Sequence, residues 1–222
     1  MPSDTTAERV EQIRLRIASA CRRSGRTPDE VTLIGVTKGF PAAAVREAWA
    51  AGLRHFGENR VREAQAKLPE LADLADVTWH MIGHLQTNKV KTAVGLFDII
   101  HSVDSLHLAE EISRRAPHTV PAFLEVNVAG ESSKFGMSLK ELPSSYEAIT
   151  RLPNLHVRGL MTVAPVATDP QDARPIFHEL REAAYQLGLR ELSMGMTDDF
   201  EAAIEEGSTH IRVGRAIFGE RV

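Results

Sequence analysis

The sequence predicts an α/β protein that forms a single (β/α)8 TIM-type barrel, and three observations lead to this fold class. Short β-branched or apolar runs alternate with amphipathic helical stretches along the chain. The strands recur roughly every 20 to 35 residues, which is the spacing of repeated βα units. Eight such units are enough to close a barrel, because right-handed crossovers leave the sheet no free edge. An open doubly wound sheet is the alternative that strand counting leaves open.

The first segment predicts a helix that precedes the barrel repeat. Thr5 and Glu8 have the spacing of a capping box, and Val10 begins an apolar stripe on one helical face. Gly25 and Pro28 end the helix. We therefore expect an N-terminal helix within residues 1–27 and the barrel within residues 31–222.

The remaining elements follow from the same patterns. Strands are expected at residues 31–37, 54–57, 77–83, 98–103, 121–128, 156–163, 190–194 and 210–213. Helices are expected between them at residues 42–51, 61–68, 106–115, 173–187 and 199–206. No low-complexity linker divides the chain, so residues 1–222 are predicted to form one domain.

Composition excludes several classes of function. The 222 residues are 43% hydrophobic and carry a net charge of −4, with both signs of charge interspersed, so nucleic-acid binding has no electrostatic support. Cys21 is the only cysteine, which excludes an internal disulfide and a cysteine-rich metal site. No stretch has membrane-spanning length, and the first residues lack an apolar signal core. We expect a soluble, cytoplasmic protein.

Lys38 closes the apolar run V-T-L-I-G-V-T-K. A lysine at the carboxyl end of a barrel strand lies at the edge where barrel proteins build their sites. Its amine can form a Schiff base with an aldehyde or ketone. A solvated or paired lysine is the alternative.

Two later loops suit a phosphate. In barrels, phosphates often bind the loops after strands seven and eight. Here those segments are S-M-G-M-T-D-D, which begins at Ser193, and I-R-V-G-R, in which Gly214 precedes Arg215. Small and hydroxyl residues there can present backbone amides and a hydroxyl group to an anion.

Arg212 is predicted to point into the barrel. Strand alternation in H-I-R-V puts Ile211 and Val213 on one face, and Arg212 on the other. An inward guanidinium needs a partner, either a core carboxylate or a ligand atom. Together with Lys38 and the two loops, Arg212 suggests a phosphorylated aldehyde, and pyridoxal phosphate fits this description.

Seven motifs make the interpretation specific. They are G-V-T-K, H-F-G-E-N-R-V-R-E, W-H-M-I-G-H-L-Q-T-N-K, V-N-V-A-G-E-S-S-K-F-G, R-G-L-M-T-V, S-M-G-M-T-D-D and I-R-V-G-R-A-I-F-G, in this order. Over nearly the whole chain, this order resembles the pyridoxal-phosphate homeostasis protein family, also called the proline synthase co-transcribed homologues. That family is similar to the N-terminal barrel of alanine racemase, of PLP fold type III.

The resemblance implies how the aldehyde and ring of pyridoxal phosphate (PLP) would be held. It implies a Schiff base at Lys38, with Asn59 near the ring hydroxyl, Met161 along the ring and Arg212 at the ring nitrogen.

The resemblance also implies phosphate contacts from Ser193, Gly195, Thr197 and Gly214. Thr197 stands where the family often has serine, which keeps a hydroxyl. Arg215 stands where many members have threonine, so that position offers a backbone amide and a positive charge instead.

The chemistry of these residues favours a carrier over a catalyst. Arginine cannot accept the proton that a carboxylate would share with the ring nitrogen, so Arg212 makes the ring a poorer electron sink. Racemisation needs a second acid/base, which in alanine racemase is a tyrosine from a C-terminal domain that we expect to be absent here. Tyr146 and Tyr185 both fall in predicted outer helices. We therefore predict a PLP-binding homeostasis protein without substantial turnover, monomeric, with apo PLP enzymes as transient recipients.

Other interpretations stay open. A racemase-like enzyme, a Schiff-base aldolase without cofactor and an interaction protein with a vestigial site are the competing functions. Lys134 is a candidate second amine for PLP transfer, with a solvated loop lysine as the alternative. His80 and His84 lack a third ligand, so no metal site is predicted. Glu58 is expected to be a carboxylate at a helix start.

Overall fold

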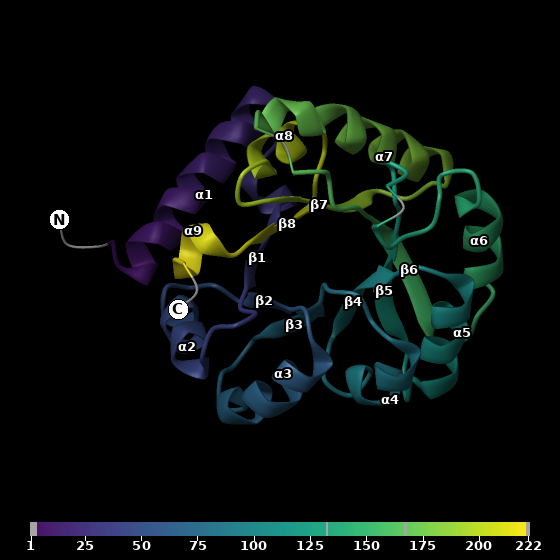
Figure 1. The fold of residues 1–222 in the computed structure, drawn as a ribbon. Helices are drawn as coiled ribbons and strands as arrows, with labels where there is room; N and C mark the ends of the chain where they lie inside the picture. Colours follow the sequence, from purple (N-terminus) through teal and green to yellow (C-terminus); the bar gives the residue numbers. More distant parts are fainter. Residues whose placement is uncertain (1–3, 132, 167, 221–222) are drawn as a thin grey trace.

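The computed structural model describes residues 4–131, 133–166 and 168–220, and in these ranges eight parallel strands close into a barrel (Figure 1). Each strand pairs with its neighbour in the sequence, and β1 pairs with β8 to complete the ring. The predicted fold class is therefore confirmed. The strands are β1 (Thr32–Val36), β2 (His55–Glu58), β3 (Thr78–Met81), β4 (Ile99–Val103), β5 (Val120–Glu125), β6 (Leu155–Met161), β7 (Glu191–Met196) and β8 (His210–Val213).

Helices surround the barrel on its outer side (Figure 1). Short 3-10 helices at Pro28–Glu30, Leu68–Leu71, Thr87–Lys89 and Pro170–Ala173 lie in the connections. Helices α4, α6 and α9 lie outside the helical ranges predicted above, and α4 and α9 are too short to show an apolar period. The helices are α1 (Thr6–Arg23), α2 (Ala42–Ala50), α3 (Val61–Lys67), α4 (Val90–Ala93), α5 (Leu106–Arg115), α6 (Leu142–Ile149), α7 (Arg174–Gln186), α8 (Phe200–Glu205) and α9 (Arg215–Phe218).

Helix α1 completes the helical ring beside the last strand. The predicted capping box forms, because the Glu8 amide donates to Thr5 Oγ1 at 3.2 Å and the Thr5 amide donates to Glu8 Oε2 at 2.7 Å. The apolar stripe of α1 packs in one buried cluster with Ile211 and Val213 of β8. Since α9 is a single turn, α1 takes the place that a full helix after β8 would have, next to α8 and α9 (Figure 1).

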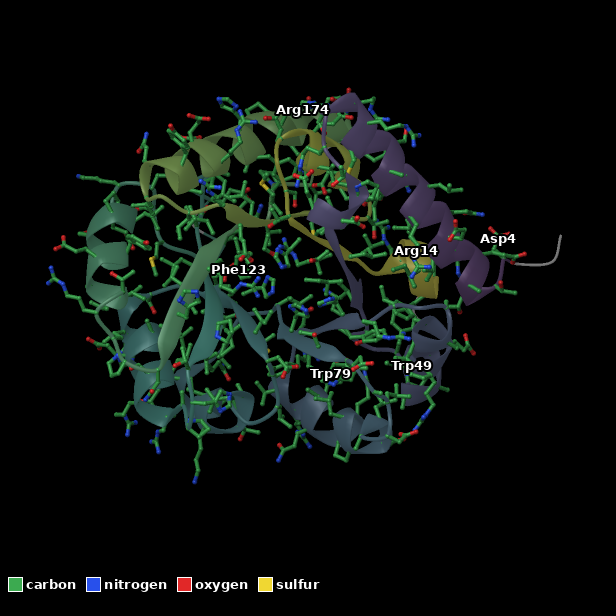
Figure 2. All side chains as sticks on the ribbon, turned by 180° about the vertical axis from the view of Figure 1, so that it is seen from behind. Asp4, Arg14, Trp49, Trp79, Phe123 and Arg174 are labelled. Carbon is green, nitrogen blue, oxygen red and sulfur yellow. The ribbon has the colours of Figure 1, made fainter. Side chains whose placement is uncertain are left out.

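The two faces of the sheet differ in chemistry. Outward-facing residues such as Leu160 and Leu192 belong to the main apolar layer between strands and helices. The interior holds a small apolar cluster of Ile99, Phe123 and Met161 (Phe123 is labelled in Figure 2). Beside it lie buried polar side chains, namely those of His80, His101, Ser193, His210 and Arg212. Barrel interiors are usually filled by branched apolar residues, so this polar filling calls for a specific explanation.

In the part of the chain that the structure describes, no helix is both long enough and apolar enough to cross a membrane.

Candidate functional site

A cavity of about 530 Å³ opens at the carboxyl ends of the strands, where the βα loops gather. Its volume is in the range of small-molecule sites. Apolar side chains of Val36, Ile82 and Val163 form part of its wall. It also brings together many of the residues predicted to bind a cofactor, namely Lys38, Asn59, Thr197, Arg212, Gly214 and Arg215.

Lys38 lies two residues after the end of β1 and is half-buried in the cavity wall. The backbone on both sides of it is anchored. On one side, Lys67 Nζ donates to the Thr37 carbonyl at 2.8 Å. On the other, the Gly39 amide donates to Glu63 Oε1 at 2.5 Å. This anchoring fixes the position from which the Lys38 side chain enters the cavity.

The anchor is a buried ion-pair network that the sequence interpretation did not predict. Lys67 Nζ lies 2.7 Å from Glu58 Oε1 and 3.1 Å from Glu63 Oε1. Glu58 is fully buried and also accepts a hydrogen bond from Thr37 Oγ1 at 2.6 Å. Burial raises the pKa of Glu58, and the hydrogen bonds from Lys67 and Thr37 oppose this shift. The expectation of a helix-start carboxylate was wrong, because Glu58 ends β2 and points at Lys67.

Asn59 offers the cavity an amide group. Its Oδ1 atom is buried and has no hydrogen-bond partner among the described residues. Gly83 packs so closely that a Cβ there would lie 2.4 Å from the Asn59 carbonyl oxygen. A buried acceptor without a partner costs free energy, so Asn59 suits a ligand hydroxyl that can donate to it.

The two predicted anion loops lie side by side. The Gly214 amide donates to Thr197 Oγ1 at 3.4 Å, and both residues line the cavity. Gly195 does not line it, but a φ of +92° gives the loop after β7 its shape. Arg215 forms an ion pair with Asp198 and stands at the rim of the cavity, with half of its side chain exposed.

Arg212 reaches the cavity from the barrel interior, as strand alternation predicted. Its Nη1 atom donates to the Ser193 carbonyl at 2.8 Å and to Ser193 Oγ at 2.6 Å, and Nη2 donates to the Thr162 carbonyl at 2.8 Å. Burial lowers the pKa of Arg212 to about 10, opposed by the nearby charges of Asp199 and Glu125. At neutral pH the guanidinium is therefore still charged.

Ser193 and Met161 lie in the barrel interior and are not among the residues that line the cavity. The Ser193 hydroxyl bonds Arg212 and His101, and Met161 packs with Ile99 and Phe123. Ser193 therefore contacts a cavity residue from the barrel interior. The direct ligand contacts predicted for Ser193 and Met161 remain predictions.

Two half-buried carboxyl groups, Glu125 and Asp199, lie near Arg212. Burial raises the pKa of Glu125 to about 7, the charge of Asp104 raises it further, and Arg212 opposes the shift. Burial also raises the pKa of Asp199, and a hydrogen bond from the Met196 amide opposes that shift. Arg212 is thus the positive member of a charged group beneath the cavity.

Among the residues that the structure describes, none of the other candidates from the sequence lines the cavity, although Lys134 lies near its rim. Lys134 forms an ion pair with Glu131 at 2.8 Å, and its Nζ is 3.4 Å from the Val163 carbonyl at the rim. His84 pairs with Asp104 at 3.0 Å and stacks on Phe135. No cluster of potential metal ligands occurs in the described residues, and Tyr146 and Tyr185 lie on outer helices as predicted.

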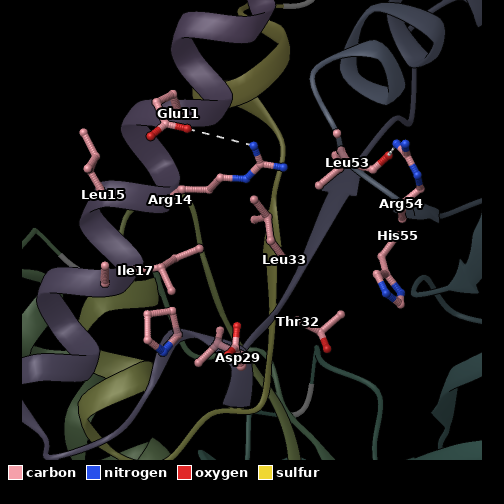
Figure 3. A pocket seen from close by; sticks show the side chains of 14 residues that line it. Glu11, Arg14, Leu15, Ile17, Asp29, Thr32, Leu33, Leu53, Arg54 and His55 are labelled. Carbon is pink, nitrogen blue, oxygen red and sulfur yellow. Dashed lines mark hydrogen bonds and ion pairs between the residues drawn. The ribbon is translucent and has the colours of Figure 1, made fainter.

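A larger cavity, of about 610 Å³, lies at the opposite end of the barrel, between α1 and the amino ends of β1 and β2 (Figure 3). Its basic side chains already have partners. Arg14 lies 3.9 Å from Glu11, and Arg54 donates to the carbonyls of Trp49 and Leu53. This cavity therefore offers less to an anionic ligand than the one that Lys38 lines.

The residues of the carboxyl-end cavity fit a phosphorylated aldehyde with an aromatic ring. Lys38 offers an amine, and Thr197 with Gly214 offers a hydroxyl and a backbone amide. Arg212 offers a buried positive charge, and Asn59 offers an acceptor that lacks a partner within the described chain. A phosphorylated aldehyde with an aromatic ring requires groups of these kinds around it.

Comparison with known proteins identifies the family. Residues 9–222 match the family model of the alanine racemase N-terminal domain. The chain is 46% identical over 222 residues to a pyridoxal phosphate homeostasis protein of Pseudomonas aeruginosa, and the match covers 98% of this chain and 96% of that protein. An Escherichia coli protein of the same name is 38% identical over 225 residues, covering 97% and 96%.

Solved structures with the same fold support this family. PipY of Synechococcus elongatus, determined with PLP bound, is 44% identical and superposes with a TM-score of 0.83, covering 94% of this chain and all (100%) of that chain. An alanine racemase of Clostridium difficile has a TM-score of 0.73 at 11% identity, covering 94% of this chain and 56% of that chain, and so shares the fold. The chain belongs to the pyridoxal phosphate homeostasis protein family, within the fold family of the alanine racemase N-terminal domain.

Proposed function

We propose that this protein binds PLP in the carboxyl-end cavity and serves PLP homeostasis inside the cell, without substantial turnover of its own. One observation carries the proposal, namely that Lys38, Thr197, Gly214 and Arg212 line a single cavity of about 530 Å³. Lys38 would hold the aldehyde carbon as a Schiff base, Thr197 and Gly214 the phosphate, and Arg212 the ring nitrogen. The PLP-bound structure of PipY, 44% identical, supports this assignment.

When bound, PLP supplies an electron-accepting pyridine ring. Arg212 does not increase that capacity, because a guanidinium only donates hydrogen bonds and cannot share a ring proton as a carboxylate does. No tyrosine lines the cavity within the described residues. Tyr185 lies on α7 and is 79% exposed, which leaves it unsuited to the second acid/base that racemisation needs.

In the proposed function, the protein is a monomeric carrier that passes PLP to apo-enzymes. The names of the Pseudomonas and Escherichia relatives support a homeostasis role. Lys38 is only half-buried in the cavity wall, which would let a recipient protein approach the linkage.

The absorption spectrum of the purified protein with added PLP tests the proposal. We expect a visible band that disappears on borohydride reduction, and a reduced adduct on Lys38 in peptide mass spectrometry. Lys38→Ala should abolish the adduct, whereas Lys91→Ala, at an exposed helix position, should leave it unchanged. A protein that stays colourless with added PLP would refute PLP binding.

A second assay tests the carrier role. We expect transfer of PLP from the loaded protein to an apo-enzyme, and no interconversion of amino-acid enantiomers at high protein concentration. Turnover of enantiomers that Lys38→Ala abolishes would instead assign a racemase.

A further inference from the structure

A chain of hydrogen bonds crosses the barrel interior and ends at Arg212. His55 Nδ1 lies 3.0 Å from His80 Nε2, and His80 Nδ1 lies 2.9 Å from His101 Nε2. His101 Nδ1 lies 2.8 Å from Ser193 Oγ, which accepts from Arg212 Nη1 at 2.6 Å. The chain thus connects side chains of β2, β3, β4, β7 and β8 across the barrel.

The inner part of this hydrogen-bond chain is fully buried, which favours neutral imidazole rings. His80, His101 and Ser193 are each 0% exposed. Burial holds the pKa of His101 well below its ordinary value, and the neighbouring positive charges act in the same direction. Burial does the same for His80, with His55, His210 and Arg158 adding to the effect. A neutral imidazole has one donor nitrogen and one acceptor nitrogen, so each ring must choose between two tautomers.

Arg212 determines that choice. A guanidinium can only donate, so Ser193 Oγ must accept from it. The hydroxyl hydrogen of Ser193 then needs its own acceptor, and within the described residues His101 Nδ1 is its remaining side-chain partner. If His101 donated instead, this hydrogen would be buried without an acceptor, which costs free energy.

The polarity then passes along the chain. With Nδ1 as acceptor, His101 carries its hydrogen on Nε2 and donates to His80 Nδ1. His80 in turn donates from Nε2 to His55 Nδ1. His55 is half-buried and lines the cavity at the amino end of the barrel (Figure 3), so the chain ends where its last donor can meet water.

We propose that His101 and His80 are positioning residues for Arg212, acting through Ser193. The chain holds the Ser193 hydroxyl with a lone pair toward the guanidinium, which fixes one edge of Arg212 beneath the cavity. The proposal rests on the proposed function, because Arg212 matters to the cavity only if PLP, or another ligand that accepts from it, binds there.

The barrel also contains a matched control. His210 is a buried interior ring that contacts both His101 and Phe123. Its Nδ1 atom, however, bonds Thr209 Oγ1 at 2.9 Å, outside the chain. His101→Phe and His210→Phe therefore both remove a buried imidazole, but only His101→Phe breaks the path to Arg212.

PLP affinity, measured by absorption titration at pH 7.5, separates positioning from packing. His101→Phe should weaken binding about tenfold or more, because Ser193 Oγ, which accepts from the charged Arg212, is no longer held in orientation. His210→Phe should stay within about twofold of the wild type. His101→Asn should retain most of the affinity although it leaves a void, since the asparagine Oδ1 can accept from Ser193.

The melting temperatures of the same variants show whether a change in affinity merely reflects a loss of stability. His101→Asn should be the less stable of the two His101 variants and yet the tighter binder. Affinities that follow stability instead would overturn the proposal. If His101→Phe does not fold, the smaller His101→Leu, which also cannot accept from Ser193, should weaken PLP binding by a similar factor.

Nitrogen-15 NMR of the unloaded protein tests the polarity independently of PLP. We expect both His80 and His101 as Nε2–H tautomers, with their signals assigned by loss in His80→Phe and His101→Phe. A positively charged ring, or an Nδ1–H tautomer at either position, would refute the predicted direction of these hydrogen bonds. A wild-type protein that shows this polarity but no PLP binding would refute the proposed function alone.

Discussion

Replacing Lys67 by methionine tests the buried network that anchors Lys38. Methionine keeps most of the aliphatic volume of lysine, so the change removes the charge and leaves little void. Glu58 then remains at 0% exposure without the partner that lies 2.7 Å away in the native protein. Removing one member of a buried ion pair typically costs about 3–5 kcal/mol, and we expect this loss in the free energy of unfolding at pH 8.

The loss should depend on pH in a definite direction. Burial already raises the pKa of Glu58, and Lys67 opposes that shift. Without Lys67 the pKa of Glu58 in the folded state rises further above its unfolded value. A raised folded-state pKa stabilises the protein below the unfolded pKa, and this contribution is lost as pH rises through the folded pKa. The deficit of Lys67→Met should therefore be smallest near pH 5 and grow toward pH 8.

Urea unfolding of the wild type and Lys67→Met at pH 5, 6.5 and 8 measures both effects. Arg151→Met is the matched control, since Arg151 pairs with Glu147 on an exposed face and its loss should cost at most about 0.5 kcal/mol. The double variant Lys67→Met with Glu58→Gln should show less pH dependence than Lys67→Met alone. A deficit below about 1 kcal/mol at pH 8, or one that shrinks as pH rises, would refute this account of the network.

Two further predictions concern the floor and the loops of the cavity. The pKa of Glu125, raised to about 7, gives a stabilisation that is present below the unfolded pKa and lost as pH rises through about 7. Glu125→Gln should therefore gain stability relative to the wild type between pH 5 and 8, by on the order of 2 kcal/mol in urea unfolding, and parallel pH profiles would contradict this. Gly195→Ala should cost more than about 2 kcal/mol, because φ is +92° and the new Cβ would lie 2.5 Å from Ala203 Cβ. Gly25→Ala, with φ +68° and nothing within 4 Å of a Cβ, should cost only about 1 kcal/mol in the same thermal or urea unfolding; equal losses would mean that the contact at Gly195 is relieved.

Strand periodicity in the sequence is enough to predict the barrel and some of the residues that point into its interior. The alternation that placed Arg212 inside the barrel applies also to T-W-H-M, where Trp79 and Met81 share the apolar face and His80 lies on the other. In I-I-H-S-V it does not decide, because His101 shares its face with Ile99 and Val103. The signal at His80 is easily overlooked, because the histidine spacing in W-H-M-I-G-H suggests a metal site instead. The closed barrel followed from the repeated βα pattern, because the spacing of strands and helices is a local property.

The buried network around Lys38 had no such signal. Glu63 and Lys67 have i, i+4 spacing, which usually means an exposed pair on a helix surface. That Lys67 instead turns inward to Glu58 and the Thr37 carbonyl depends on how α3 is rotated against β1 and β2. Such rotation is set by tertiary packing and leaves no local pattern in the sequence. For the same reason the sequence did not reveal that Ser193 lies beneath the cavity.

The position of α1 also constrains the order in which the chain can fold during synthesis. Its apolar stripe packs against β8, whose residues lie about 200 positions later in the sequence. While the ribosome makes the intervening strands, the stripe of Val10, Ile13 and Ile17 lacks this final partner. A nascent chain therefore exposes the apolar face of this helix until β8 emerges, and exposed apolar surface promotes chaperone binding or aggregation. The barrel should close late and in one cooperative step, when both ends of the described chain are present.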